Sequence, residues 1–157
     1  NTVAQTAAFK FRSVGAEAVA YDGINEHYTV YMRGRSTTCA IALSFTGSNP
    51  GMVRAARFLR ANDIFVIGVG GTETALLASE CDVFIPVTST RLIMTMEAVS
   101  SVAGVGYVLD VFFAALMVGN YQENLDAALE VMRTHGMPSS PGASTRTDGP
   151  KNADRKR

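Results

Sequence analysis

Residues 38–60, TCAIALSFTGSNPGMVRAARFLR, show the pattern of a strand, a polar loop and a helix. Cys39 to Leu43 is a short continuous apolar run, which is typical of a strand buried on both faces of a parallel sheet. The run stops at Ser44, and six residues later Pro50 offers a start for a helix, since proline has no N–H to lose in the first turn. This stretch predicts an α/β fold.

The helix predicted from Pro50 has two different faces. Its apolar residues fall on one stripe, whereas its arginines are spaced three apart on another. The helix should therefore pack on the sheet and show a basic side. The apolar residues are Met52, Val53, Ala56 and Leu59, and the basic ones are Arg54, Arg57 and Arg60.

The loop from Ser44 to Asn49 is dense in hydrogen-bond donors, with three hydroxyls and one amide. A helix N-terminus has unpaired N–H groups and a partial positive charge, and loop hydroxyls add donors around a bound anion. The pattern predicts a phosphate or carboxylate site. The alternative is that Ser48 or Asn49 only caps the helix. A Walker-type loop is excluded because no Gly-Lys-Ser/Thr follows, and a dinucleotide fingerprint because its glycine triplet is absent.

Ser44-Phe45-Thr46-Gly47-Ser48-Asn49 resembles the Ser-x-Ser/Thr-Gly-x-Thr/Asn phosphate loop of SIS (sugar isomerase) domains. Thr2 to Gly15 resembles the first helix of these domains, and Ala18 to Asp22 resembles their second strand. Cys81 to Val87 resembles their Ala-Asp-x-x-Leu/Ile-x-Val strand. Together with the long helix ending in LDVFFAALM, the sequence is most similar to the sugar-phosphate-sensing domain of RpiR-type transcriptional regulators.

This resemblance implies a doubly wound parallel sheet with helices on both faces, of flavodoxin-like type, over residues 1–137. It also implies a phosphorylated sugar as ligand, with no cofactor. In the family, a first strand, a second phosphate loop and a helix-turn-helix domain precede the first helix, so we expect them upstream of Asn1 and expect DNA contact only through them. The implied ligand-binding residues are Ser44, Thr46, Gly47, Ser48 and Asn49.

The alternative function is a sugar-phosphate aldose-ketose isomerase. Isomerisation needs a base near the substrate carbon and usually a histidine that opens the ring. The candidates are Glu97, Glu26 and His27, but the His-Gly-Asp-Leu-Gly stretch of the arabinose-phosphate isomerase branch is absent. We therefore favour a regulator and assign no catalytic residue, and we keep Glu97 and Ser100 as possible ligand-binding residues.

Length and composition indicate one domain, because 157 residues with 47% hydrophobic content can bury a sizeable core. Residues 1–137 carry 9 basic and 12 acidic side chains, so the body offers no broad basic surface for nucleic acid. Cys39 and Cys81 both adjoin apolar runs, and we expect them to be buried free thiols in a reducing cytoplasm. No metal-ligand spacing occurs, and no export signal opens the chain.

Further elements follow from the same patterns. Strands are predicted at 17–21, 63–68 and 83–87, and a short helix at 73–80. The glycines of 68–71 invite a dinucleotide reading that fails at Glu73, so a flexible loop at the edge of the site is expected. A final amphipathic helix is predicted at 122–132.

Residues 92–118 are apolar almost all round. They could span a bilayer, but Asp110 in the middle argues against this. A helix packed on the sheet and on a second copy explains the same composition, so we expect no membrane contact and a homodimer, with close packing at Gly104 and Gly106. Residues 138–157 contain three of the five prolines and five basic side chains, which predicts a disordered basic tail.

Overall fold

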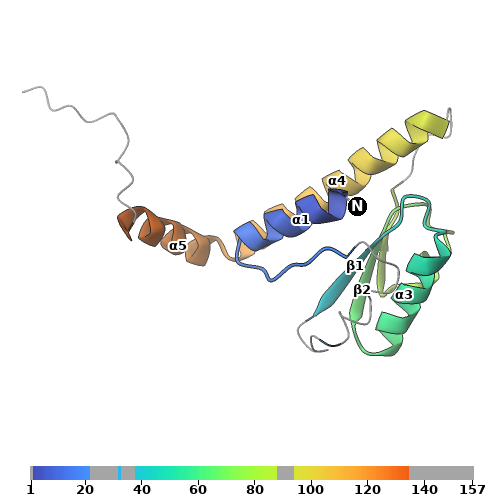
Figure 1. Ribbon diagram of the computed structural model, residues 1–157, viewed down its shortest axis with the longest axis horizontal. Helices are drawn as coiled ribbons and strands as arrows, with labels where there is room; N and C mark the ends of the chain where they lie inside the picture. The colour runs from blue at the N-terminus through green and yellow to red at the C-terminus, as the bar shows by residue number, and fades with distance from the viewer. Residues whose placement is uncertain (1, 22–31, 33–37, 88–93, 135–157) are drawn as a thin grey trace, which may run out of the picture. The chain divides into compact units, whose positions relative to one another are not determined.

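The computed structural model describes residues 2–21, 32, 38–87 and 94–134, the side chains of 94–99 excepted. The chain divides into two compact units, and the second begins at Gln122. The first unit holds the sheet and four of its covering elements (Figure 1). The predicted tail at 138–157 lies outside the described residues, as do Glu26 and His27.

The sheet of the first unit consists of three parallel strands in the order β1-β2-β3. Strand β1 spans Cys39–Leu43, β2 spans Phe65–Val69 and β3 spans Val83–Ile85. The register pairs Leu43 with Val69 and Val69 with Ile85. Because the strands are parallel, the loops that follow them leave from one edge of the sheet, which is where α/β proteins place their ligands.

One face of the sheet is covered by helix α3, Pro50–Ala61. Strand side chains alternate between the two faces, and Ala42 and Val66 point to this one. They pack with the apolar stripe of α3 and with Leu77, which is completely buried. The predicted stripe is thus confirmed for its buried members. This core contains Ala42, Val53, Ala56, Leu59, Ile64, Val66, Leu77 and Cys81.

The opposite face is covered by helices α1, Thr2–Ser13, and α4, Met94–Gly119, which lie side by side (Figure 1). The alternate residues of β1 and β2 pack here, and Lys10 Nζ of α1 forms a 2.5 Å ion pair with Asp110 of α4. Helices on both faces of a parallel sheet confirm the predicted fold class. The buried residues of this second core are Ala7, Phe11, Val69, Val105 and Leu109.

The basic side of α3 is paired with acidic residues of the segment that enters β3. Arg57 Nη2 lies 2.7 Å from Glu80 Oε1, and this hydrogen bond lowers the pKa of Glu80. Arg60 Nε donates to Asp82 Oδ1 at 3.0 Å, while Asp82 Oδ2 accepts from the Val66 N–H at 2.8 Å. Asp82 therefore links α3 to the strand β2, which it also helps to align.

Three local predictions were wrong. Residues 17–21 form no strand: Arg12 Nη1 donates to the Ala18 carbonyl at 2.7 Å, so that carbonyl is used outside any ladder. Within 73–80 only the 3₁₀ turn η1, Ala78–Glu80, is helical. The N–H of Leu77 is drawn to the Gly47 carbonyl at 2.9 Å, which prevents an α-helical ladder there. Cys39 is exposed, whereas Cys81 is buried as expected.

Helix α4 is only partly used by the core. A Cβ on Gly104 would lie 2.4 Å from Val87 Cγ1, so this glycine allows close packing inside the chain rather than between chains, whereas Gly106 faces open space. In the described residues, one helix, over Ser100–Gly119, is long and apolar enough to cross a membrane by length and composition. Such a test is also passed by core helices of α/β domains, and Val105 and Leu109 place α4 in one.

The second unit contains helix α5, Tyr121–Thr134. It matches the final amphipathic helix predicted from the sequence. None of its residues is buried. Its apolar side chains therefore lack a partner surface within the described residues.

Candidate phosphate-binding site

The loop that follows β1 begins with a tight turn. The N–H of Ser44 donates to the Val69 carbonyl at 3.1 Å, which extends the ladder by one step, and the N–H of Gly47 donates back to the Ser44 carbonyl at 2.9 Å. Ser44 is buried. Gly47 has φ +66°, a left-handed conformation that glycine adopts without strain. The sequence places a glycine where this turn requires one.

The loop after β2 supports this turn from the side. A Cβ on Gly70 would lie 2.1 Å from the Ser44 carbonyl oxygen, and one on Gly71 would lie 2.6 Å from the Thr46 carbonyl oxygen. The Gly71 N–H donates to the Phe45 carbonyl at 3.0 Å. The glycines at 70 and 71, expected as a flexible loop, thus form a close backbone support for the turn.

The N-terminus of α3 is capped by its own chain. Asn49 Oδ1 accepts from the N–H groups of Gly51 at 2.9 Å and Met52 at 3.2 Å. The N–H of Val53 donates to the Asn49 carbonyl at 3.0 Å, and Pro50 has no N–H. The capping alternative therefore describes the side chain of Asn49. The helix still contributes the positive end of its dipole to the loop.

Donors for an anion remain in the loop itself. Within the described part of the chain, no hydrogen bond is found for the backbone N–H groups of Phe45, Thr46 and Asn49. Thr46 Oγ1 accepts from the Ser48 N–H at 3.3 Å and keeps its own proton for another acceptor. The Ser48 hydroxyl reaches the Thr46 carbonyl only at 3.5 Å, a weak contact. Sequence reasoning foresaw the hydroxyls but not these N–H groups.

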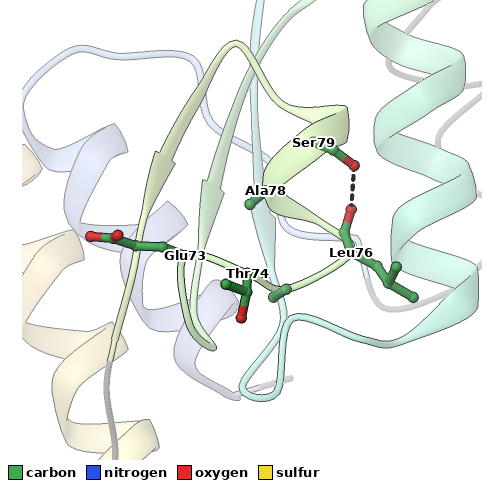
Figure 2. Close-up of a pocket in the computed structure, with 6 residues that line it drawn as sticks. Glu73, Thr74, Leu76, Ala78 and Ser79 are labelled. Atoms are coloured by element: carbon green, nitrogen blue, oxygen red, sulfur yellow. Dashed lines mark hydrogen bonds between the residues drawn. The ribbon is translucent and has the colours of Figure 1, made fainter.

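A hollow of about 440 Å³ adjoins the loop and is shown in Figure 2. Its lining does not include the hydroxyls of 44–49, but it includes Ala75, on which Gly47 packs so closely that a Cβ on Gly47 would lie 2.4 Å from Ala75 Cβ. Glu73 points away from Leu76 and Ser79, whose hydroxyl donates to the Leu76 carbonyl at 3.0 Å. The hollow is lined by Glu73, Thr74, Ala75, Leu76, Ala78 and Ser79.

The two further candidates lie on α4. Ser100 is exposed and has an interaction partner, and the side chain of Glu97 lies outside the described residues. Thr74, the nearest hydroxyl of the second loop, shares a 3.1 Å hydrogen bond with Thr72. Among the described residues, no three His, Cys, Asp or Glu side chains gather as a metal site would require.

A model of the SIS domain family matches residues 1–115, which include both loops, the sheet and most of α4. This chain belongs to the SIS domain family. The predicted family is therefore confirmed. No curated protein matches the sequence.

Solved structures share the fold of this SIS domain. The Vibrio vulnificus NanR protein complexed with ManNAc-6P superposes with a TM-score of 0.70 at 19% identity, over 85% of this chain and 52% of NanR. The sugar isomerase domain of an RpiR transcription factor from Sphaerobacter thermophilus gives 0.66 at 17%, over 84% and 72%. Escherichia coli CFT073 c3406, in complex with a sugar phosphate, gives 0.58 at 22%, over 73% and 62%. The chain thus spans about half the length of NanR.

Proposed function

We propose that this SIS domain binds a phosphorylated sugar, with the phosphate on the loop 44–49, and that the ligand controls transcription through a DNA-binding domain outside these 157 residues. The observation that carries the proposal is the set of available N–H groups at Phe45, Thr46 and Asn49. They lie in one short loop together with the hydroxyls of Ser44 and Ser48. A cytoplasmic location follows from such a role.

The chemistry of the loop suits a phosphate better than a neutral group. Several N–H and O–H donors within six residues can each bond one of the oxygens of a phosphate, and hydrogen bonds to a charged acceptor are the stronger kind. The positive end of the α3 dipole adds favourable electrostatics. The backbone contacts with Gly71 and Leu77 hold these donors before a ligand arrives, which limits the entropy lost on binding.

The comparisons support the class of ligand and the type of protein. NanR and c3406, which have the same fold, are described in complexes, NanR with ManNAc-6P and c3406 with a sugar phosphate, and another neighbour is named as a transcription factor. A sugar phosphate as effector is the role that unites these neighbours with the loop of this chain.

Calorimetric titration with ManNAc-6P, an arabinose phosphate and the same sugars without phosphate tests this function. We expect binding of a phosphorylated sugar only, and Thr46→Ala should weaken it by about 1–3 kcal/mol, the value of a hydrogen bond to a charged group. Ser13→Ala is the matched control, because Ser13 donates its hydroxyl to the Lys10 carbonyl at the far end of α1. Equal affinity for both forms of the sugar, or an unaffected Thr46→Ala, would refute the site.

Enzyme activity is the competing outcome. A regulator should not interconvert aldose and ketose phosphates, whereas an isomerase should show turnover that Glu97→Gln abolishes, since Glu97 is the candidate base on α4. A coupled assay on the purified chain, with Glu123→Gln on α5 as the control carboxylate, separates the two. Turnover lost only in Glu97→Gln would replace the regulator with the isomerase.

A further inference from the structure

Helix α4 carries an apolar stripe on the side that faces away from the sheet. Its members recur at spacings of four, four, three and four residues, so they lie along one side of the helix. Three of them are prominent: Tyr107 is 72% exposed, Val111 47% and Val118 71%. We call this surface the outer stripe of α4, made of Ala103, Tyr107, Val111, Ala114 and Val118.

Helix α5 carries a second apolar stripe that is equally uncovered. Leu125 and Leu129 lie four residues apart, and every apolar member of the stripe is exposed. The other side of the helix is polar, with Glu123, Asp126 and Glu130. The apolar stripe of α5 consists of Tyr121, Leu125, Ala128, Leu129 and Met132.

The two stripes match in character and in length. At 1.5 Å per residue the outer stripe of α4 is about 22 Å long and that of α5 about 17 Å. Apolar surface of this extent is unfavourable in water, and burying one stripe against the other would remove both from solvent at once.

A single residue, Asn120, separates the two helices. Its N–H donates to the Leu116 carbonyl at 3.2 Å, so the helical hydrogen bonding continues through the junction. Antiparallel helices in one chain are joined by loops of about two to five residues. One residue that remains hydrogen-bonded to α4 is too short a connection for such a hairpin.

We propose that α5 of one chain packs on the outer stripe of α4 of a second copy, and that the second copy returns the same contact. A twofold axis makes this exchange reciprocal, so one arrangement covers all four stripes of the pair. The proposal does not depend on the proposed ligand, because none of its residues belongs to the loop 44–49.

A lipid bilayer is the other occupant that the composition of α4 suggests. The opposite side of the helix packs on α1 and the sheet through Val105 and Leu109, and Asp110 is ion-paired with Lys10. A helix held in this way cannot be surrounded by lipid. We therefore commit to the second copy as occupant.

Light scattering on the purified full chain, with circular dichroism for folding, tests the exchange. We expect a dimer at micromolar concentration. Leu125→Glu combined with Leu129→Glu should leave the helix content unchanged and weaken the dimer about 100-fold or more, because two charges would be buried without partners. Ala127→Glu, on the polar side of α5, should remain dimeric. A monomeric wild-type chain, including one that pellets with phosphatidylcholine vesicles, or a dimeric double variant would overturn the proposal.

Disulfide cross-linking distinguishes exchange from other pairings. In a Cys39→Ser background, a mixture of V111C and L129C should give a cross-linked dimer that contains one chain of each kind. A disulfide within one chain of the V111C and L129C double variant would show that α5 folds back on its own α4. A dimer from V111C alone would show that α4 packs on α4. Either of these two results contradicts the exchange.

Discussion

Gly70 shows how a single missing side chain shapes the site. Its φ of +120° and the 2.1 Å that would separate an added Cβ from the Ser44 carbonyl oxygen leave room for glycine alone. The sequence displays the glycines of 68–71, but it does not reveal that they lie against the turn after β1. That contact depends on the β1-β2 pairing, which brings together two loops that are far apart in the sequence.

Gly70→Ala should therefore destabilise the protein by about 1–3 kcal/mol, through backbone strain and overpacking against Ser44. Urea unfolding measures the change. Gly106→Ala is the control, since Gly106 lies inside α4 with open space around its Cβ position and should gain about 0.5–1 kcal/mol. If both variants kept the wild-type stability, the close approach of the two loops would be wrong.

The buried thiol of Cys81 makes stability depend on alkaline pH. Burial raises the pKa of Cys81 to about 11 from an ordinary value of 9. The unfolded chain then releases this proton at lower pH than the folded one, so stability is complete below pH 9 and falls as pH rises towards 11, by up to about 2 kcal/mol. Unfolding curves at pH 8 and pH 10.5 should show a smaller loss for Cys81→Ala, and equal losses in both proteins would contradict the assignment.

At the scale of elements, Asn49 has two separable roles. As the cap of α3 it bonds the N–H groups of Gly51 and Met52, and it also offers its own N–H in the loop. Asp caps helices as well as Asn does but brings a negative charge towards a bound phosphate.

Asn49→Ala should therefore lower stability by about 1 kcal/mol, whereas Asn49→Asp should keep stability and weaken sugar-phosphate binding. Thermal unfolding and calorimetric titration of both variants provide the two readings. Unchanged binding by Asn49→Asp would place the phosphate away from the start of α3.

Sequence patterns predicted the elements whose apolar residues alone decide them. The continuous run Cys39–Leu43 and the stripe of α3 led to β1 and its covering helix, and both were found. Residues 17–21 alternate like a strand, but Ala18 packs on the α1 and α4 core without joining a ladder. The helix predicted at 73–80 fails because the N–H of Leu77 bonds the Gly47 carbonyl, a long-range contact that local propensity does not contain.

At the scale of the whole molecule, the site results from three chain segments that meet at one edge of the sheet. The turn after β1, the glycines after β2 and the segment that carries Leu77 are joined by backbone hydrogen bonds. The hydroxyls of the turn were predicted from the sequence. The availability of its N–H groups was not, because it depends on which carbonyls the neighbouring loops already occupy.

The most direct test of the sugar-phosphate site is an NMR titration of the ¹⁵N-labelled full chain with the phosphorylated sugar that binds best. The amide signals of Phe45, Thr46 and Asn49 should shift most and saturate together, because a new acceptor changes the shielding of each bonded N–H. The same sugar without phosphate should leave them in place. Saturable shifts confined to residues outside the loops at the carboxyl edge of the sheet, with these three amides unmoved, would contradict the site.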